Sequence, residues 1–240
     1  MDHVYIIYSH SDYADILKVQ NDYMKNINGK KILFIDKLID NKDGSIYDGV
    51  YFYDNNLNYT KRILQCLKLA NLSQDFIIFI HEVDILINVD NNYIPNILKI
   101  MNKDNIDRVD LKCEINEEIE GYHLIESTGN YIFNVNPSIW KLSSYINLLT
   151  IYDYSYRDVE HSDIQEYCKK NLKIIIFSGL PVKAGYYNVL PFFTFFHISH
   201  YGHLLPKNNQ KNNLSSELQS IYEKIILKYN FKRYFRGEMH

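Results

Sequence analysis

The chain has 240 residues, of which 46% are hydrophobic and 15% aromatic, enough for one large α/β domain or two small ones with a substantial core. A formal net charge of -3 produces no strong field toward nucleic acid, so a nucleic-acid partner is not expected. No apolar run approaches the roughly 20 residues that cross a bilayer, and the first residues lack the basic-then-apolar pattern of a signal peptide.

Strand-like and helix-like patterns alternate through the first half of the chain, which is typical of a parallel sheet. We predict strands at 4–8, 31–36, 49–53, 76–80 and 107–113, and helices at 12–27, 59–70 and 93–101. The second half is less regular. There we predict strands at 131–133 and 173–177, helices at 137–149, 162–171 and 214–229, and a polar linker at 206–213.

Three scattered cysteines, Cys66, Cys113 and Cys168, form no CxxC pair. They indicate neither a zinc site nor a disulfide framework, and we expect small buried side chains in a reducing compartment. The expected location is therefore the cytoplasm.

An acid-x-acid triplet ends the most apolar of these strands. Glu82 and Asp84 follow the run from Phe76 to Ile80, and ligands of open α/β sheets bind beyond the carboxyl ends of the strands. Side chains two apart on a strand share a face. Two carboxylates so placed repel each other unless a proton or a cation lies between them. They predict a divalent metal, Mn²⁺ or Mg²⁺, that holds a phosphate; an exposed acidic turn is the alternative.

Polar residues also follow the first strand, where Tyr8, Ser9, His10 and Asp12 precede a helix. Ser9 and Asp12 are suited to hydrogen-bond a ribose or a base, and Tyr8 or His10 to stack on one. An ordinary helix N-cap is the alternative. Neither GxGxxG nor GxxxxGK[ST] occurs, so metal-mediated phosphate binding fits better than a P-loop.

Two acids before the 162–171 helix are candidates for a general base. An inverting sugar transfer needs one carboxylate to take a proton from the attacking hydroxyl. Glu160 is the first choice and Asp158 the second; capping of the helix by first-turn acids is the alternative.

A dense histidine segment follows, in which His197 and His203 are candidates to face a metal or a pyrophosphate, with His200 facing elsewhere. The basic and aromatic stretch 228–236 has two interpretations, peripheral contact with an anionic membrane or lipid-linked acceptor, and a solvated helix end.

Four segments in this order resemble small GT-A-type glycosyltransferases of large DNA viruses and bacterial surface-polysaccharide clusters. They are IIYSHSDYADIL, YDNNLNYTKRILQCL, FIIFIHEVDILI and FNVNPSIWKLSSYINLL followed by VEHSDIQEYC, and they span residues 4 to about 170. The resemblance implies a single-domain, Rossmann-like α/β fold with a mixed, mainly parallel sheet flanked by helices. It implies a glycosyltransferase domain at 1–205, with a nucleotide-binding half at 1–115 and an acceptor half at 116–205. A linker and a C-terminal helix packed on the domain would occupy 206–240. If the chain is viral, the compartment is the host cytoplasm.

The resemblance also implies roles for particular residues. Glu82 and Asp84 take the place of the DxD metal motif, with Glu in place of the first Asp, and His197 or His203 that of a late metal or phosphate ligand. Tyr8, Ser9, Asp12 and Arg62 fall near a UDP- or GDP-sugar donor, and Asn136 and Trp140 near the glycan, glycolipid or glycoprotein acceptor. Glu160 falls near the catalytic carboxylate of inverting members. Two other functions stay open: a metal-dependent nucleotidyltransferase, and a non-catalytic glycan-binding module on the same fold.

Overall fold

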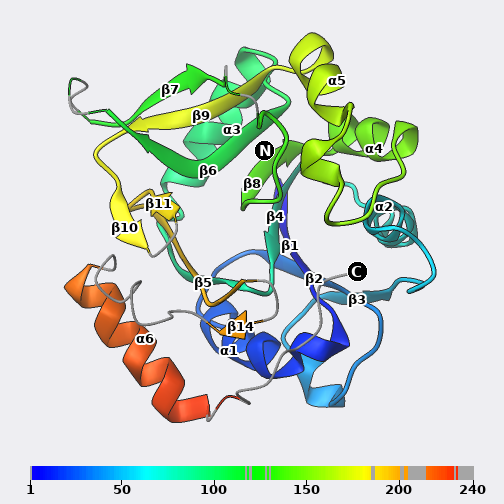
Figure 1. Cartoon of the computed structure of the whole chain (residues 1–240), viewed down its shortest axis with the longest axis vertical. Helices are drawn as coiled ribbons and strands as arrows, with labels where there is room; N and C mark the ends of the chain where they lie inside the picture. The colour runs from blue at the N-terminus through cyan, green and yellow to red at the C-terminus, as the bar shows by residue number, and fades with distance from the viewer. Residues whose placement is uncertain are drawn as a thin grey trace.

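A central β-sheet runs through the computed structural model, which describes residues 2–116, 118, 121–127, 129, 131–184, 187–200, 203–204, 215–229 and 231 (Figure 1). Its strands are β1 (His3–Tyr8), β2 (Lys30–Ile35), β3 (Gly49–Phe52), β4 (Phe76–His81), β6 (Arg108–Ile115), β7 (His123–Glu126), β8 (Ser138–Lys141), β9 (Ile174–Gly179), β10 (Val182–Ala184) and β11 (Tyr187–Val189). Two short pairs lie apart from it, β5 (Asp84–Val89) with β12 (Phe193–His197), and β13 (Ser199–His200) with β14 (His203–Leu204). The helices are α1 (Ala14–Met24), α2 (Tyr59–Ala70), α3 (Tyr93–Lys103), α4 (Leu142–Ile151), α5 (Ile164–Asn171) and α6 (Ser216–Tyr229), and the 3₁₀ turns are η1 (Ser11–Tyr13), η2 (Asn41–Gly44) and η3 (Val159–His161).

The strand order identifies the fold. The order β3-β2-β1-β4 is parallel throughout, and antiparallel β8 then separates β4 from β6. Beyond β8, β9 pairs in parallel with β6, and β7 lies antiparallel on β9. The predicted fold class is confirmed in its architecture: a Rossmann-like, mixed and mainly parallel sheet flanked by helices in a single domain.

Both faces of the sheet are buried because the central strands are apolar at almost every position. Tyr5, Ile7 and Ile78 belong to a core that includes residues of α1 and α3. Ile6 and Phe79, on the other face, belong to a second core with residues of α2, α4 and α5. All three cysteines are buried and unbridged, as predicted.

The segment around β8 differs from the prediction. Residues 138–141 form a strand between β4 and β6, and the predicted helix at 137–149 begins only at Leu142. The predicted strand at 131–133 is an irregular loop. Pairing on both sides places Ile139 and Trp140 in opposite cores, which a helical period could not do. Strands β5, β7 and β12 were not predicted, and the predicted linker at 206–213 lies outside the described residues.

Helix α6 lies alongside α1 (Figure 1). Tyr222 and Ile225 belong to a third core with Ile16 of α1, with Val83 in the turn before β5, and with Phe196 of β12. Outside this core, Asp22 of α1 accepts hydrogen bonds from Lys228 and Tyr229. The helix therefore supports the β5–β12 pair from the side of α1.

Candidate active site

The carboxyl ends of β1, β2 and β4 meet at one point of the sheet. Strand β1 lies between β2 and β4: the chain passes from β1 to β2 and β3 on one side and then crosses to β4 on the other, which makes this a topological switch point. Backbone hydrogen bonds join the three ends, from Ser9 N to Phe34 O at 2.9 Å and from Glu82 N to Tyr8 O at 3.0 Å. Ser9 and Glu82 are thus neighbours of this point, where open α/β sheets bind ligands.

Glu82 is a buried carboxyl group without a hydrogen-bond partner. Its residue is 0% exposed, and neither carboxylate oxygen has a partner in the described part of the chain. Burial raises the pKa of Glu82 well above its usual value; its own backbone N–H lowers the pKa by less, and the nearby carboxylate of Asp84 adds to the rise. Buried polar groups are normally matched, so this carboxyl group is suited to keep a proton or to bind a cation.

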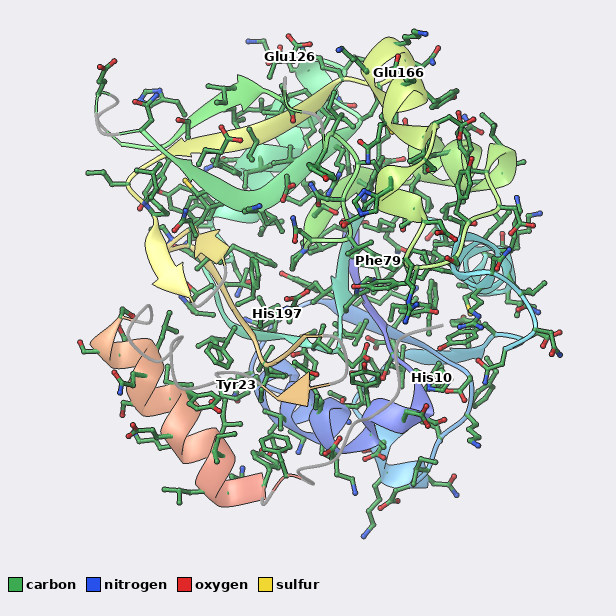
Figure 2. All side chains as sticks on the ribbon, in the orientation of Figure 1. His10, Tyr23, Phe79, Glu126, Glu166 and His197 are labelled. Carbon is green, nitrogen blue, oxygen red and sulfur yellow. The ribbon has the colours of Figure 1, made fainter. Side chains whose placement is uncertain are left out.

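Asp84 and His197 form a buried pair across β5 and β12. The two strands pair antiparallel with His197 opposite Asp84, and His197 Nδ1 lies 2.7 Å from Asp84 Oδ1. Both side chains are buried, and Figure 2 shows His197 in the interior beside β5. The structure therefore brings together two predicted metal ligands that are 113 positions apart. We call Glu82, Asp84 and His197 the acidic edge.

An aromatic cluster lies behind the switch point. Tyr8 stacks on Tyr53 with ring centroids 5.2 Å apart and meets Tyr59 edge to face. The hydroxyl of Tyr59 lies 2.8 Å from His81 Nε2, and burial lowers the pKa of His81 to about 4, so this imidazole is neutral at pH 7. Tyr8, predicted near the nucleoside, is 1% exposed and belongs to this cluster.

Asp36, directly after β2, organises the loop that follows β1. Its carboxylate accepts hydrogen bonds from Ser11 N and Ser11 Oγ at 2.7 Å each, and from Asn55 at 3.1 Å. Burial raises the pKa of Asp36, but the Ser11 bonds and His10, 3.6 Å away, outweigh it, so the pKa lies below its usual value. Asp36 was not among the predicted site residues, although its position at the end of a predicted strand was a signal for it.

The other predicted donor-side residues are placed differently. Ser9 is fully buried, and its hydroxyl has no partner in the described part of the chain. Asp12 is exposed on η1. Arg62 is buried and donates from Nε to Leu57 O at 2.7 Å and from an Nη to Asn55 O at 2.6 Å. Arg62 therefore holds the loop before α2.

A second polar site lies further along the same edge of the sheet. Asp110 of β6 is level with Phe79 of β4 across Ser138 of β8, and β6 and β4 run in the same direction. Beyond Asp110 there is a cavity of about 500 Å³, which we call the side cavity. It is lined by Asp110, Lys112, Glu114, Ser127, Gly129, Tyr131, Asn134, Asn136, Glu160, His161 and Ile176.

The side cavity brings together two residues predicted separately, Glu160 and Asn136. Glu160 is half-buried, and its Oε1 accepts a hydrogen bond from Val135 N at 2.8 Å. Asp158, the second candidate base, is exposed, does not line the cavity, and accepts a hydrogen bond from Ser155 Oγ at 2.6 Å. The geometry distinguishes the two acids.

Trp140 is enclosed in the core. It is 2% exposed and stacks on Tyr145 with ring centroids 4.7 Å apart. The guanidinium carbon of Arg108 lies over its ring, 5.1 Å from the centroid. No face of its ring is open to a sugar in this structure. Tyr131, predicted to be part of a strand, lines the side cavity instead and is 58% exposed.

The acidic edge offers the donor types that Mn²⁺ and Mg²⁺ accept, two carboxylates and an imidazole. The unpartnered oxygens of Glu82 fit a cation, because burial otherwise leaves the carboxylate charge uncompensated. Within the described residues, no group of three or more His, Cys, Asp or Glu side chains is gathered closely enough to hold a metal. The side chains of His200 and His203, and residues 230 and 232–236 of the basic stretch, lie outside the described part.

Comparisons with known proteins give similarity of fold. No family model matches the chain, and no curated protein matches it. A solved fragment of S. aureus TarS (residues 1–349) is similar in structure, with 13% sequence identity and a TM-score of 0.45. The matched region covers 75% of this chain and 60% of that chain. A putative nucleotide-diphospho-sugar transferase from Desulfovibrio desulfuricans G20 is similar in structure, with 6% sequence identity and a TM-score of 0.47. The matched region covers 75% of this chain and 81% of that chain.

CMP:2-keto-3-deoxy-manno-octonic acid synthetase in complex with CTP is similar in structure, with 10% sequence identity and a TM-score of 0.49. The matched region covers 95% of this chain and 100% of that chain. The chain thus spans about three fifths of the TarS fragment, which is the first of these structures. All three TM-scores lie below 0.5. In the described helices, no segment is both long and apolar enough to cross a membrane.

Proposed function

We propose that the protein is a metal-dependent glycosyltransferase that moves a sugar from a UDP- or GDP-sugar to a hydroxyl acceptor with inversion. The observation that supports it best is the acidic edge at the switch point, where Glu82 is buried with both carboxylate oxygens unpartnered in the described chain. A cation there would complete a site that burial alone leaves unfavourable.

The donor would occupy the edge formed by β1, β2 and β4. Asp84 and Glu82 would supply two carboxylate ligands to Mn²⁺ or Mg²⁺, with diphosphate oxygens of the donor completing the shell, and His197 would hold Asp84 in place. The ion would neutralise the departing diphosphate as a Lewis acid. Asp36 keeps the Ser9–Ser11 loop in place with both of its oxygens, so this loop is ordered before a nucleoside binds. Such preorganisation lowers the ordering cost of binding.

Glu160 would act as the general base. Its carboxylate lies on the side cavity and accepts the Val135 N–H, which orients it without neutralising it. It would take the proton from the acceptor hydroxyl as that oxygen attacks the anomeric carbon from the side opposite the diphosphate. One base in this position suffices for inversion, which is why we prefer that outcome.

Thermal unfolding with nucleotides tests the donor site. We expect UDP or GDP to raise the Tm in the presence of Mn²⁺ and to do so much less after chelation, because ligands that bind only the folded state stabilise it. We also expect donor hydrolysis or transfer with one member of a nucleotide-sugar panel. No shift with any nucleoside diphosphate and no turnover of any donor would contradict the proposal.

The same assays separate the two alternatives. Pyrophosphate release from a nucleoside triphosphate and a sugar 1-phosphate, without use of any nucleotide sugar, would assign a nucleotidyltransferase instead. A glycan-binding module would keep its glycan affinity when Glu82 and Asp84 are replaced by Ala, and would turn over no donor. A transferase loses activity by orders of magnitude with the same replacements.

A further inference from the structure

The loop from 131 to 136, on one wall of the side cavity, is held in place by polar contacts. Buried Arg108 donates to Ile132 O at 3.0 Å, and to Asn134 O and Oδ1 at 3.1 and 2.6 Å. From the other side, the Gln165 amide donates to Phe133 O at 2.7 Å and accepts from Phe133 N at 2.8 Å. The loop is thus fixed between β6 and α5 without any ligand.

Asn134 links this loop to two residues that line the side cavity, Asp110 and Asn136. Its Nδ2 donates to Asp110 Oδ2 at 2.6 Å, while its Oδ1 accepts from Asn136 N at 3.1 Å. Val135 N donates to Glu160 at 2.8 Å. The backbone of Asn136 is therefore positioned by its neighbours.

The side-chain amide of Asn136 is the exception. Asn136 lines the side cavity and is 9% exposed, but its side-chain amide makes no hydrogen bond to the described part of the chain. Neither amide atom is among the fully enclosed, unpartnered side-chain atoms of the described residues, so the amide faces the cavity and can bond a group that enters it. An amide offers one donor group and one acceptor, which is the pattern that a hydroxyl group complements.

The charges around the cavity disfavour an anion. The described lining has three carboxylates, Asp110, Glu114 and Glu160, and only one lysine, Lys112. Arg108 lies 3.6 Å behind Asp110 and compensates that carboxylate from within the core. A phosphate or a uronate in the cavity would meet like charges that the one lysine does not outweigh.

One aromatic ring is open on the same cavity. Tyr131 is 58% exposed and meets His161 edge to face, with centroids 5.7 Å apart and planes at 83°. A ring held at a polar cavity can cover the apolar C–H face of a pyranose, while amides and carboxylates bind its hydroxyl groups.

We propose that the side cavity selects an uncharged saccharide as the acceptor, with the Asn136 amide binding a hydroxyl and Tyr131 stacking on the sugar ring. Only the assignment of the bound saccharide as the acceptor rests on the proposed function. The binding itself requires neither a donor nor a metal.

Ligand-observed NMR by saturation transfer tests the proposal, with metal-free protein and a panel of neutral methyl glycosides and disaccharide glycosides. The charged probes are the matching glucuronide and the hexose 6-phosphate. The variants are Asn136→Ala and Tyr131→Ala, with Asn102→Ala and Tyr93→Ala on α3 as controls, since Asn102 and Tyr93 are exposed and outside the cavity lining. Circular dichroism and Tm verify that each variant folds.

We expect at least one neutral glycoside to bind, the charged analogues to bind at least about tenfold more weakly, and each cavity variant to weaken binding about tenfold. The controls should bind as the wild type does. No binding by any neutral glycoside, preference for the charged probes, or unchanged affinity in both folded cavity variants would overturn the proposal.

The outcome is separable from that of the donor experiments. Saccharide binding without any nucleotide-dependent Tm shift or turnover would leave a saccharide site and refute the transferase. Nucleotide binding and turnover without saccharide binding in the cavity would refute only the acceptor assignment.

Discussion

The acidic edge and the side cavity lie along the same edge of one sheet, and both are rich in carboxylates. At the acidic edge, Glu82 is fully buried and has no partner in the described chain, so burial raises its pKa. In the side cavity, Glu160 is half-buried and accepts a backbone N–H, and Asp110 accepts from Asn134. The buried Glu82 needs a proton or a cation, whereas Glu160 and Asp110 already have hydrogen-bond partners and line an open cavity.

The comparison shows that residue type alone does not assign a chemical role. A buried carboxylate without partners is suited to bind a metal or to carry a proton. A half-exposed carboxylate oriented by one hydrogen bond is suited to accept a proton from a bound hydroxyl. The following predictions test whether the two regions differ in this way.

The largest effect is expected at the acidic edge. Asp84→Asn removes the charge beside His197 and should lower transfer about a thousandfold, because stabilisation of the leaving diphosphate is lost. The measurement is kcat/KM with the best donor, with exposed Glu166→Gln on α5 as control (Figure 2). Activity within a few fold of the wild type would remove Asp84 from the metal site.

Glu160→Gln tests the side cavity. The amide cannot take a proton, and kcat should fall about a hundredfold or more, with a Tm close to that of the wild type. Asp158→Asn is the matched comparison, because Asp158 is exposed and outside the cavity lining, and it should keep its activity. If Asp158→Asn causes the larger loss, the roles of the two acids are reversed.

Glu82→Gln tests the buried charge through pH. Because burial raises the folded-state pKa of Glu82 above its usual 4.5, its contribution to stability is present below that pH and lost as pH rises toward the folded pKa. The free energy of unfolding of the variant minus that of the wild type should therefore rise with pH, by up to about 1.4 kcal/mol per pH unit. Urea unfolding at several pH values measures it.

His81 gives the opposite pH dependence of stability in both the wild type and Glu82→Gln. Its contribution therefore cancels in the difference between their free energies of unfolding. Burial lowers its folded-state pKa to about 4 from 6.5, so its contribution is present above pH 6.5 and lost as pH falls through 4. Added Mn²⁺ should flatten the Glu82 difference if the ion replaces the proton. A difference independent of pH in metal-free protein would mean that Glu82 is charged in the fold.

The smallest effect is expected at α6. Asp22→Asn weakens the contacts with Lys25, Lys228 and Tyr229, and should cost less than about 1 kcal/mol because the site is partly exposed and screened by salt. Since α6 supports the strands of Asp84 and His197, the nucleotide-dependent Tm shift should fall slightly and saccharide binding should not change. An effect on saccharide binding alone would contradict this division.

Particular elements show how far local pattern reaches. The strands at 4–8 and 76–80 and the helix at 59–70 were predicted nearly residue by residue, because their apolar runs and helical spacing are properties of adjacent residues. The strand at 138–141 was predicted as helix, since only pairing with β4 and β6 makes it a strand. Strand β5 was not predicted because the acidic triplet, whose last residue Asp84 begins β5, was interpreted as the end of an element.

The candidate site divides in the same way. Acids after a buried strand could be found from the sequence, and so could Glu160 and Asn136 as separate candidates. Tertiary structure alone decided that these two line one cavity, that His197 lies 2.7 Å from Asp84, and that Trp140 is enclosed while Tyr131 is open. The physical reason is range: hydrophobic period is local along the chain, whereas burial and hydrogen-bond partners depend on residues brought together from far apart.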